Sequence, residues 1–452
     1  FLQRWDKTIT YDWHLGLAGL VMLVNWQLMG YMMVIYIAGL QNVPPELIEA
    51  SQIDGASRWQ TLRNVTLPMI MPSITICLFL TLANTFKMYD QNLALTNGAP
   101  AKQTQMAALS IVNTMYKKIG QEGVAQAEAV IFFLIVAAIA LIPAERHSFQ
   151  GGRRVSTAVK TQSPASAVPA GQKVAPQTTG QKTLVGLLAV LAFVWVIPLA
   201  FIVINSFKGK FYISDSPFAL PTAKTFAGLD NYATGLALSG FASAMGWSLF
   251  ITVGSVVVIV FLTAMTAYYI TRIKTWWTSM IYYAFAFSMI APFQMVMFPT
   301  VKVADQLGLA TPWGMIVLYL GFGGGLSVFL FAGFIKSIPL EIEEAAYMDG
   351  CSPLQTYFKV VMPLLKPTAV TVAILNAMWV WNDFLLPNLV IGQDERYKTV
   401  PIVIQSLVGS NGNRDMGAQM AMLVFAIVPI VAFYLFGQKH IIEGVAAGAV
   451  KG

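Results

Sequence analysis

The sequence predicts an all-α, multi-pass transmembrane helical bundle of about nine spans, built from two homologous units that run parallel through the membrane. The first observation is the composition, because 56% of the 452 residues are hydrophobic and only 11% are charged, whereas a soluble protein carries about 25% charged residues. The second is a series of long apolar windows without charge. The third is a segment that occurs twice. Together they exclude an ordinary soluble globular protein.

Charge and cysteine content exclude several other classes. The net charge is +7, but Lys and Arg are spread thinly between apolar blocks and form no stripe, so we expect no nucleic-acid partner. Only two cysteines are present, Cys77 in an apolar run and Cys351 in a polar loop, which argues against a disulfide scaffold. The three histidines have no ligand spacing around them, so we expect no metal site.

Nine windows are long and apolar enough for a spanning helix, which takes about 20 mostly apolar residues. They cover residues 15–38, 69–86, 129–144, 184–207, 241–270, 276–298, 313–334, 367–389 and 416–437. The third window is short. Trp13, Trp276, Trp277 and Trp313 lie at window ends, where an amphipathic ring prefers the level of the lipid headgroups.

Loop charge orients these spans, because cytoplasmic loops of membrane proteins carry an excess of Lys and Arg. The excess here is small and comes mainly from residues 145–183. We therefore place that segment in the cytoplasm, together with residues 39–68, 271–275, 335–366 and the tail after residue 437, and we place the start of the chain outside.

One segment is predicted to be a flexible linker. Residues 147–181 are rich in Ser, Thr, Ala, Pro and Gly and show no apolar periodicity. The linker divides the chain into residues 1–146, with three expected spans, and residues 182–452, with six. The chain begins with Phe1 and not with Met, so we expect that its natural N-terminus is missing.

The repeated segment covers residues 44–72 and 339–367, which align without a gap at a constant offset of 295 positions. Each copy predicts a helix, a turn and a second helix. Gly55 and Gly350 end the first helix, where a positive φ is needed. The second helix begins with a Ser-x-x-Gln capping box, and a proline then closes the element. The capping residues are Ser57 with Gln60 and Ser352 with Gln355, and the closing prolines are Pro68 and Pro363.

The positions of the two copies predict their function. Six expected spans separate them, so both helix-turn-helix elements, here called the knobs (residues 44–72 and 339–367), emerge on the same face of the membrane. An inverted repeat would place equivalent loops on opposite faces. We interpret the knobs as docking surfaces for a partner that is itself a two-fold dimer, in preference to plain connecting loops.

At the knobs the sequence resembles a known family. Residues 49–56 read EASQIDGA and residues 344–351 read EAAYMDGC, which is similar to the EAA loop of the inner-membrane permease subunits of binding-protein-dependent ABC importers. The stretch WVWNDF at residues 379–384 and the tail at residues 438–452 resemble the carbohydrate branch of that family, typified by the maltose transporter.

The resemblance implies two permease units of unequal length in one chain. The second unit has six expected spans and looks complete, whereas the first is expected to lack three spans at its N-terminal side. Two such units more often occur as separate chains, and the sequence leaves open whether this two-unit chain is natural or is a fused or truncated form. Ser51 and Cys351 stand where the family pattern has Ala.

The resemblance also implies the partners. Each EAA loop would supply a coupling helix to a cytoplasmic ABC ATPase dimer, and an extracytoplasmic solute-binding protein would deliver sugar to this protein in the prokaryotic inner membrane. No G-x-x-x-x-G-K-[ST] phosphate loop occurs in the chain, so we expect ATP and Mg to bind to the ATPase, with no cofactor and no catalytic residue here. The expected coupling residues are Glu49, Ala50, Asp54, Gly55, Pro68, Glu344, Ala345, Ala346, Asp349, Gly350 and Pro363.

Polar residues at membrane depth are candidates for a substrate pathway, because ionisable groups there are costly and usually functional. Asp383 is the strongest candidate, because an acidic group beside an indole and amides suits binding of a sugar ring and its hydroxyls. The expected pathway residues are Asn84, Tyr89, Asp90, Asn376, Trp381, Asn382 and Asp383. Alternatively, Asp383 and Lys87 only anchor the spans at the outer interface. Asn25, Trp26 and Gln27 fit the pathway and interhelical hydrogen bonding equally well.

Three other functions compete with a sugar importer. An ABC importer for an amino acid or phosphate is disfavoured by the tail and by the WVWNDF stretch. A secondary transporter or channel is disfavoured by the parallel knobs and by the lack of a proton relay in the sequence of the spans. A membrane enzyme would need a nucleophile, a metal or a carboxylate pair, and no such group is recognisable in the sequence. The sequence does not name the sugar.

Overall fold

The computed structural model describes residues 11–41, 43, 45–136, 138, 179–290, 293–336, 338–407 and 415–447. In this part of the chain the regular structure is helical, apart from an isolated bridge between Lys208 and Phe226. The prediction of an all-α helical bundle is therefore confirmed. Most of the expected linker lies outside the described residues, and its last residues, 179–181, belong to helix α10.

Five described helices are long and apolar enough to cross a membrane. They are α2 (Trp13–Gln41), α10 (Thr179–Ser206), α13 (Phe241–Arg272), α16 (Pro312–Ile335) and α22 (Met416–Ala447). A sixth span results if the helix pair from Pro353 to Asn382, bent by 65°, is counted as one. Within the described residues, this number is lower than the nine spans expected from the sequence.

The other expected spans fall short for different reasons. Helix α6 (Met71–Phe86) has only 16 residues. The window at 276–298 contains α14 (Trp276–Ile290) and the start of α15 (Phe293–Gln306), and residues 291 and 292 between them lie outside the described part of the chain. The window at 129–144 extends beyond the described residues.

Each unit has a break at the end of the helix that follows its knob. In the second unit, α19 (Met362–Asn382) ends before Asp383, which adopts φ −72° and ψ 122°, and α20 (Leu385–Val390) follows. In the first unit, α6 ends at Phe86 and α7 (Asp90–Leu95) follows. The helix expected over 367–389 therefore ends earlier, at Asn382, and polar residues lie at both breaks.

Both knobs have the predicted helix-turn-helix structure. Their helices are α3 (Pro45–Ile53) and α4 (Arg58–Thr61) in the first knob, and α17 (Leu340–Met348) and α18 (Pro353–Thr356) in the second. The predicted capping boxes are present at α4 and α18. The turn glycines have the predicted positive φ, +79° at Gly55 and +83° at Gly350.

The prediction that Pro68 and Pro363 close the knobs is wrong, because both prolines lie inside helices. A π-helical segment follows the short second helix of each knob, η2 (Leu62–Thr66) and η3 (Tyr357–Val361). Pro68 then lies in α5 (Leu67–Met69) and Pro363 in α19. A proline crowds the preceding helical turn and removes one of its hydrogen bonds, and a π turn is a local departure from α geometry that occurs within helices.

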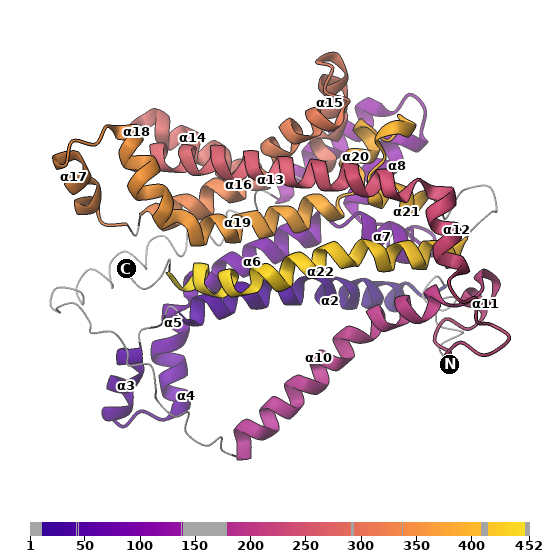
Figure 1. Cartoon of the computed structure of the whole chain (residues 1–452), viewed down its shortest axis with the longest axis horizontal. Helices are drawn as coiled ribbons and strands as arrows, with labels where there is room; N and C mark the ends of the chain where they lie inside the picture. Colours follow the sequence, from indigo (N-terminus) through magenta and orange to yellow (C-terminus); the bar gives the residue numbers. More distant parts are fainter. Residues whose placement is uncertain are drawn as a thin grey trace.

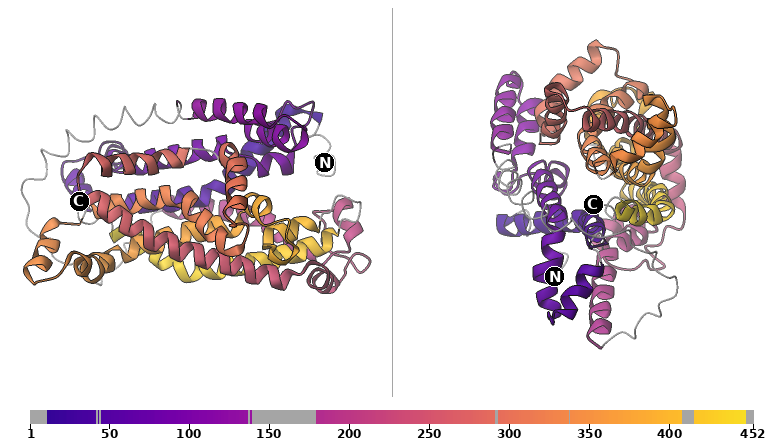
Figure 2. Two further views of the ribbon diagram at one scale, coloured as in Figure 1. Left: turned by 90° about the horizontal axis from the view of Figure 1, so that it is seen from above. Right: turned by 90° about the vertical axis from the view of Figure 1, so that its left-hand side faces the viewer.

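The two knobs lie at the same end of the bundle (Figure 1), with α3 and α17 at the left of that view. The opposite end is formed by shorter helices, namely α8 (Ala107–Lys117), α11 (Lys210–Asp215), α12 (Asp230–Ser239), η4 (Glu395–Tyr397) and α21 (Val400–Ser406). The long helices run between these two ends (Figure 2). This arrangement agrees with the prediction of parallel units whose knobs share one membrane face.

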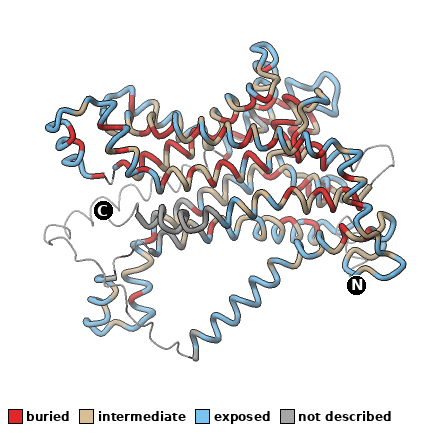
Figure 3. The backbone as a smooth tube through the Cα atoms, in the orientation of Figure 1, coloured by how far each residue is buried: buried red, intermediate tan, exposed pale blue. Residues whose placement is uncertain are grey.

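The core lies where α13, α16 and α19 pack together. Ala264, Phe331 and Leu365, one from each of these helices, belong to one buried cluster. Figure 3 shows buried residues along the three helices, whereas α10 is exposed along most of its length. An exposed apolar helix of this length suits contact with lipid.

Candidate functional site

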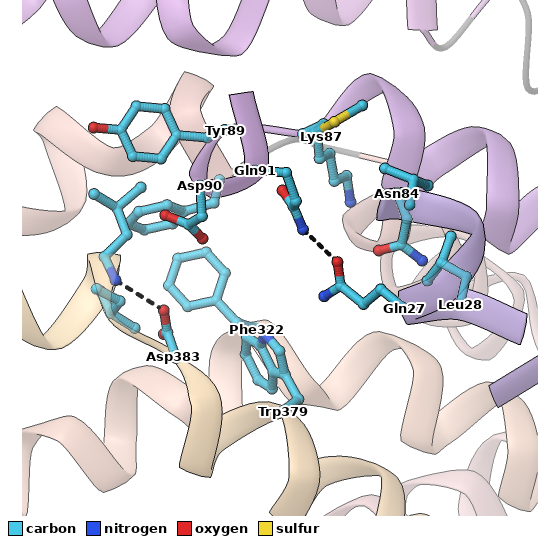
Figure 4. Close-up of a pocket in the computed structure, with 15 residues that line it drawn as sticks. Gln27, Leu28, Asn84, Lys87, Tyr89, Asp90, Gln91, Phe322, Trp379 and Asp383 are labelled. Atoms are coloured by element: carbon cyan, nitrogen blue, oxygen red, sulfur yellow. Dashed lines mark hydrogen bonds between the residues drawn. The ribbon is translucent and has the colours of Figure 1, made fainter. Parts of the chain in front are cut away.

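A cavity of about 270 Å³ lies between the two units, at the breaks that end α6 and α19 (Figure 4). Its wall combines α2, α6 and α7 of the first unit with α15, α16, α19 and α20 of the second. Both α6 and α19 begin at a knob, so the cavity is at the far ends of these helices. Its volume is close to the lower end of the range for small-molecule sites, about 300–1,000 Å³.

Equivalent positions of the two units build much of this wall. The offset that relates the knobs, 295 positions, also relates several pairs of lining residues. These pairs are Gln27 with Phe322, Asn84 with Trp379, Met88 with Asp383, Asp90 with Leu385 and Gln91 with Leu386. The cavity is therefore lined by equivalent parts of the two repeated units.

The two halves of the wall differ in chemistry. In four of the five pairs the first unit contributes an amide or a carboxyl group and the second an aromatic or aliphatic side chain. Gln91 donates from Nε2 to Oε1 of Gln27 at 2.6 Å, and Figure 4 shows both side chains in the cavity. On the second-unit side the wall contains aromatic rings, and Trp379 packs edge-on against Tyr319 with ring centroids 5.4 Å apart.

Asp383 is the carboxyl group that the second unit contributes. Its Oδ2 accepts a hydrogen bond from the hydroxyl of Tyr319 at 3.0 Å, and its Oδ1 accepts one from the backbone N–H of Leu385 at 3.1 Å. The carboxylate therefore bonds to the first backbone N–H of α20, and its two partners fix its position at the cavity. Asp90 lies on the first-unit side of the same cavity, where burial raises the pKa of its carboxyl above the ordinary value.

Lys87 connects the first unit to the second at this site. It follows α6 directly, lines the cavity, and donates from Nζ to the backbone oxygen of Met289 in α14 at 2.9 Å. Burial lowers the pKa of this amine to about 8, because a buried environment disfavours the charged form. The alternative reading of Lys87 as an interface anchor satisfied by the backbone agrees with this bond, and the residue is part of the cavity wall as well.

Asn84, Tyr89, Asp90 and Asp383 line the cavity, as the predicted pathway requires, but Asn376 does not. Asn376 is 5% exposed and donates to Ser327 Oγ of α16 at 3.0 Å. It forms a polar contact between α16 and α19 inside the second unit.

Trp381 and Asn382 also lie away from the cavity. The indole of Trp381 is 6% exposed and donates from Nε1 to the backbone oxygen of Ala426 in α22 at 3.3 Å. Asn382 is exposed, and its amide donates to the backbone oxygen of Met378 one turn earlier at 2.7 Å. The tryptophan at the cavity is Trp379, which the sequence analysis did not select.

Of three neighbouring polar residues of α2, one lines the cavity, one bonds to another helix and one bonds within α2. Gln27 lines the cavity. Trp26 donates from Nε1 to the backbone oxygen of Trp195 at 2.9 Å, and Trp195 donates to the backbone oxygen of Trp26 at 3.1 Å. This reciprocal pair joins α2 of the first unit to α10 of the second. Asn25 bonds to Val21 of its own helix.

Sequence reasoning missed Gln91, Phe322 and Trp379 in the cavity wall. A signal for two of them was present, because the 295-residue offset maps Gln27 onto Phe322 and Asn84 onto Trp379. The 295-residue offset extends from the knobs through the helices on either side.

The predicted coupling residues occupy the surfaces of the knobs. All of them are exposed except Ala346, which is 6% exposed. Three equivalent pairs of large apolar side chains are exposed beside them. These pairs are Ile53 and Met348 (86% and 88% exposed), Trp59 and Leu354 (67% and 63%), and Leu47 and Ile342 (43% and 36%). Exposed apolar side chains that gather in one place are typical of interaction surfaces.

Comparison with known families decides the class of the protein. The family of the binding-protein-dependent transport system inner membrane component matches residues 4–144 and again residues 259–446. The chain belongs to this family. Each match contains one knob, so two units of this inner-membrane component occur in one polypeptide, in agreement with the resemblance seen in the sequence.

Permease proteins of sugar transport systems are similar to parts of the chain. The probable starch degradation products transport system permease protein AmyC of Thermoanaerobacterium thermosulfurigenes is 39% identical over 272 residues, which are 60% of this chain and 97% of AmyC. AmyD of the same organism is 54% identical over 128 residues, and the match spans only 28% of this chain and 43% of AmyD. The multiple sugar-binding transport system permease protein MsmG of Streptococcus mutans is 38% identical over 268 residues, 59% of this chain and 95% of MsmG.

Proposed function

We propose that the chain is the permease of an ATP-driven, binding-protein-dependent sugar importer, and that the cavity between the units is its sugar site. The observation that carries this proposal is the wall built from equivalent positions, in which the first unit supplies most of the amide and carboxyl groups and the second unit supplies the rings of Phe322 and Trp379. A sugar ring presents apolar C–H patches that pack on an indole and hydroxyls that hydrogen-bond to amides and carboxylates. The names of the relatives, which transport starch degradation products or multiple sugars, support the same substrate class.

The knobs are the proposed docking sites for a cytoplasmic ABC ATPase dimer. Two equivalent surfaces at one end of the bundle suit a partner with two-fold symmetry, and exposed apolar side chains such as Ile53 and Met348 suit insertion into a cleft. ATP and Mg would be held by that partner. A solute-binding protein would deliver sugar at the opposite end.

The positions of these two sites support alternating access as the transport mechanism. The helices α6 and α19 lead from the knobs to the cavity, so closure of the ATPase dimer would move the ends of both helices together. Such a rigid-body change is a known way to switch a site between two faces.

Transport in proteoliposomes tests the proposal. The full chain is reconstituted with its ATPase and its solute-binding protein, and uptake of labelled maltose and ATP hydrolysis are measured together. We expect sugar-dependent uptake that requires ATP and is competed by other short glucose oligomers. Uptake of an amino acid or phosphate with no response to any sugar would favour the competing importer class, and sugar uptake driven by an ion gradient without the ATPase would contradict the proposal.

A further inference from the structure

A buried ion pair joins the second knob to helix α13. Arg272, in the last turn of α13, donates from Nε to Oε1 of Glu343 in α17 at 2.7 Å, and its Nη2 lies 2.6 Å from the same oxygen. The other carboxylate oxygen of Glu343 accepts a hydrogen bond from Tyr268 at 2.8 Å. Glu343 is 3% exposed and Arg272 is 17% exposed. Tyr268 and Arg272 are four residues apart, so one face of α13 supplies both donors.

The same guanidinium also bonds to the segment between α16 and α17, here called the elbow, which leads into the second knob. Its Nη2 donates to the backbone oxygen of Ile338 at 3.0 Å, and Ile338 lies between the end of α16 and the start of α17. The ring of Tyr268 packs against that of Tyr357 in η3, with centroids 5.1 Å apart. The end of α13 therefore contacts α17 and η3 of the second knob and the elbow before them. We call Tyr268, Arg272 and Glu343 the clamp.

Helix α13 continues from the clamp to the cavity and to the opposite end of the bundle. It has 32 residues, which corresponds to about 48 Å. Ile251 and Ile259 of α13 belong to the same buried cluster as Leu386, which lines the cavity. Farther along, Ser248 Oγ accepts a hydrogen bond from the backbone N–H of Val400 in α21 at 2.8 Å. One uninterrupted helix thus contacts the knob, the cavity wall and the far end.

The first knob is held differently. Ile48 stands at the position of Glu343, so an ion pair of this kind is impossible there. Its polar contact is internal, between Ser51 Oγ and Thr61 Oγ1 at 2.9 Å. At the corresponding position in the second knob, the buried hydroxyl of Thr356 has no hydrogen-bond partner. Within the described residues, the second knob therefore lacks this internal contact and has a contact to α13 instead.

We propose that the clamp residues are positioning residues that transmit movement of the second knob through α13 to the cavity, an inference that rests on the proposed docking of the knobs to an ATPase. Burial of an ion pair is poor evidence for a stabilising role, because apolar residues of similar volume often stabilise a fold as well. A planar guanidinium with several directed bonds instead fixes an orientation. Because this orientation is fixed, a movement of the second knob displaces α13 instead of bending the elbow at Ile338.

The ratio of sugar transported to ATP hydrolysed tests the clamp in proteoliposomes that hold the full chain, its ATPase, its binding protein and labelled maltose. We expect Arg272→Met to lower this ratio about fivefold or more, the lower limit of a typical coupling between sites. Arg272→Lys keeps the charge without the fork and should retain part of the coupling. Lys274→Met is the matched control, because Lys274 is an exposed residue in the loop directly after α13 and its loss should leave the ratio unchanged.

A double variant separates positioning from folding. Arg272→Met alone leaves the Glu343 carboxylate buried and unpaired, which is strongly destabilising. Adding Glu343→Gln removes that charge and keeps an acceptor for Tyr268, so we expect inserted protein to recover while the ratio stays low. The inference would be wrong if the double variant recovered both the amount of inserted protein and the transport ratio. It would also be wrong if inserted Arg272→Met protein had an unchanged ratio. If the unaltered chain shows no sugar-stimulated ATP hydrolysis, the proposed function fails, and the clamp inference fails with it.

Discussion

Asn84 and Trp379 occupy equivalent positions of the two units and line one cavity together. One supplies an amide and the other an indole, so the internal repeat has produced two chemically different walls from one backbone arrangement. In a homodimer both positions would carry the same residue. Joining two diverged units allows an asymmetric site, which suits a ligand with one apolar face and one hydroxylated edge.

The first prediction concerns these two side chains. Asn84→Ala removes a hydrogen-bonding group and Trp379→Ala removes an aromatic face, so each should raise the sugar concentration at half-maximal uptake. A lost hydrogen bond costs about 0.5–1.5 kcal/mol, and the loss of an aromatic contact should cost at least as much. Uptake kinetics normalised to inserted protein measure both effects. If the sugar concentration at half-maximal uptake were unchanged in both variants, the cavity would not be the sugar site.

Trp381→Ala provides the contrast. Trp381 is buried against α22 and bonds to Ala426, so its truncation leaves a hole that costs about 3–5 kcal/mol of stability. The expected result is less inserted protein with unchanged half-saturation in the fraction that survives. The sequence suggested the opposite order for Trp381 and Trp379, because a repeating pattern of apolar residues does not say which of two tryptophans faces a cavity.

The sequence predicted the fold class, the two units and the internal structure of the knobs, because these depend on local patterns. Gly55 and the capping residue Ser57 act within a few residues of chain, so their geometry follows from spacing alone. The breaks after α6 and α19 were missed, since residues such as Asp383 form them through tertiary contacts with Tyr319. The ion pair of Arg272 with Glu343 was missed for the same reason, because its partners are 71 residues apart.

The second prediction tests the geometry of the knobs. Gly55→Val and Gly350→Val place a β-branched side chain at φ of +79° and +83°, which costs roughly 1–2 kcal/mol at each position. No atom lies within 4 Å of the added Cβ at either glycine, so the effect comes from backbone strain alone. Sugar-stimulated ATP hydrolysis should fall while insertion continues.

Gly120→Val is the matched control for the knob variants. Gly120 has φ of +76° and also has no atom within 4 Å of an added Cβ, but it lies in the turn after α8, outside the knobs. It should lose a similar amount of stability and keep normal stimulation of ATP hydrolysis. Equal loss of stimulation in all three variants would show that strain, and not knob geometry, is responsible.

The third prediction tests the packing of α16. A Cβ added at Gly323 would lie 2.6 Å from Oδ1 of Asn376 and 2.8 Å from Cδ1 of Ile259, so Gly323→Ala should destabilise the second unit by about 1–3 kcal/mol. Gly321→Ala on the same helix meets no atom within 4 Å and should be tolerated. Thermal unfolding of the two purified variants compares them. Equal stability would mean that α16 and α19 do not pack this closely.

The fourth prediction is a pH dependence from Lys87. Its pKa is about 8 in the folded protein against 10.5 for an ordinary lysine, so between these values the unfolded chain binds more protons. The free energy of unfolding should therefore rise with pH across this window, by at most about 3 kcal/mol. Unfolding measured from pH 7 to pH 11 should show a slope that Lys87→Met reduces. Lys118→Met, at an exposed lysine, should keep the slope of the unaltered chain, and an identical slope in all three proteins would contradict a buried amine.

The fifth prediction is that the two units stay together when the chain between them is cut. The reciprocal bonds of Trp26 with Trp195 and the bond from Lys87 to Met289 all cross from one unit to the other, so these contacts join the units independently of the covalent connection. A protease site inserted near Ala165 allows cleavage in the membrane. We expect both fragments to copurify and uptake to persist.

Weakening the interface makes this test sharper. Trp26→Ala combined with Trp195→Ala removes both indole donors and the rings that carry them, and each hydrogen bond is worth about 0.5–1.5 kcal/mol. In the uncut chain the covalent connection keeps the units at a high local concentration, so this double variant should remain assembled before cleavage. After cleavage its fragments should separate in detergent more readily than those of the unaltered protein. Separation of the unaltered protein on cutting alone would mean that the linker, and not the interface, holds the two units together.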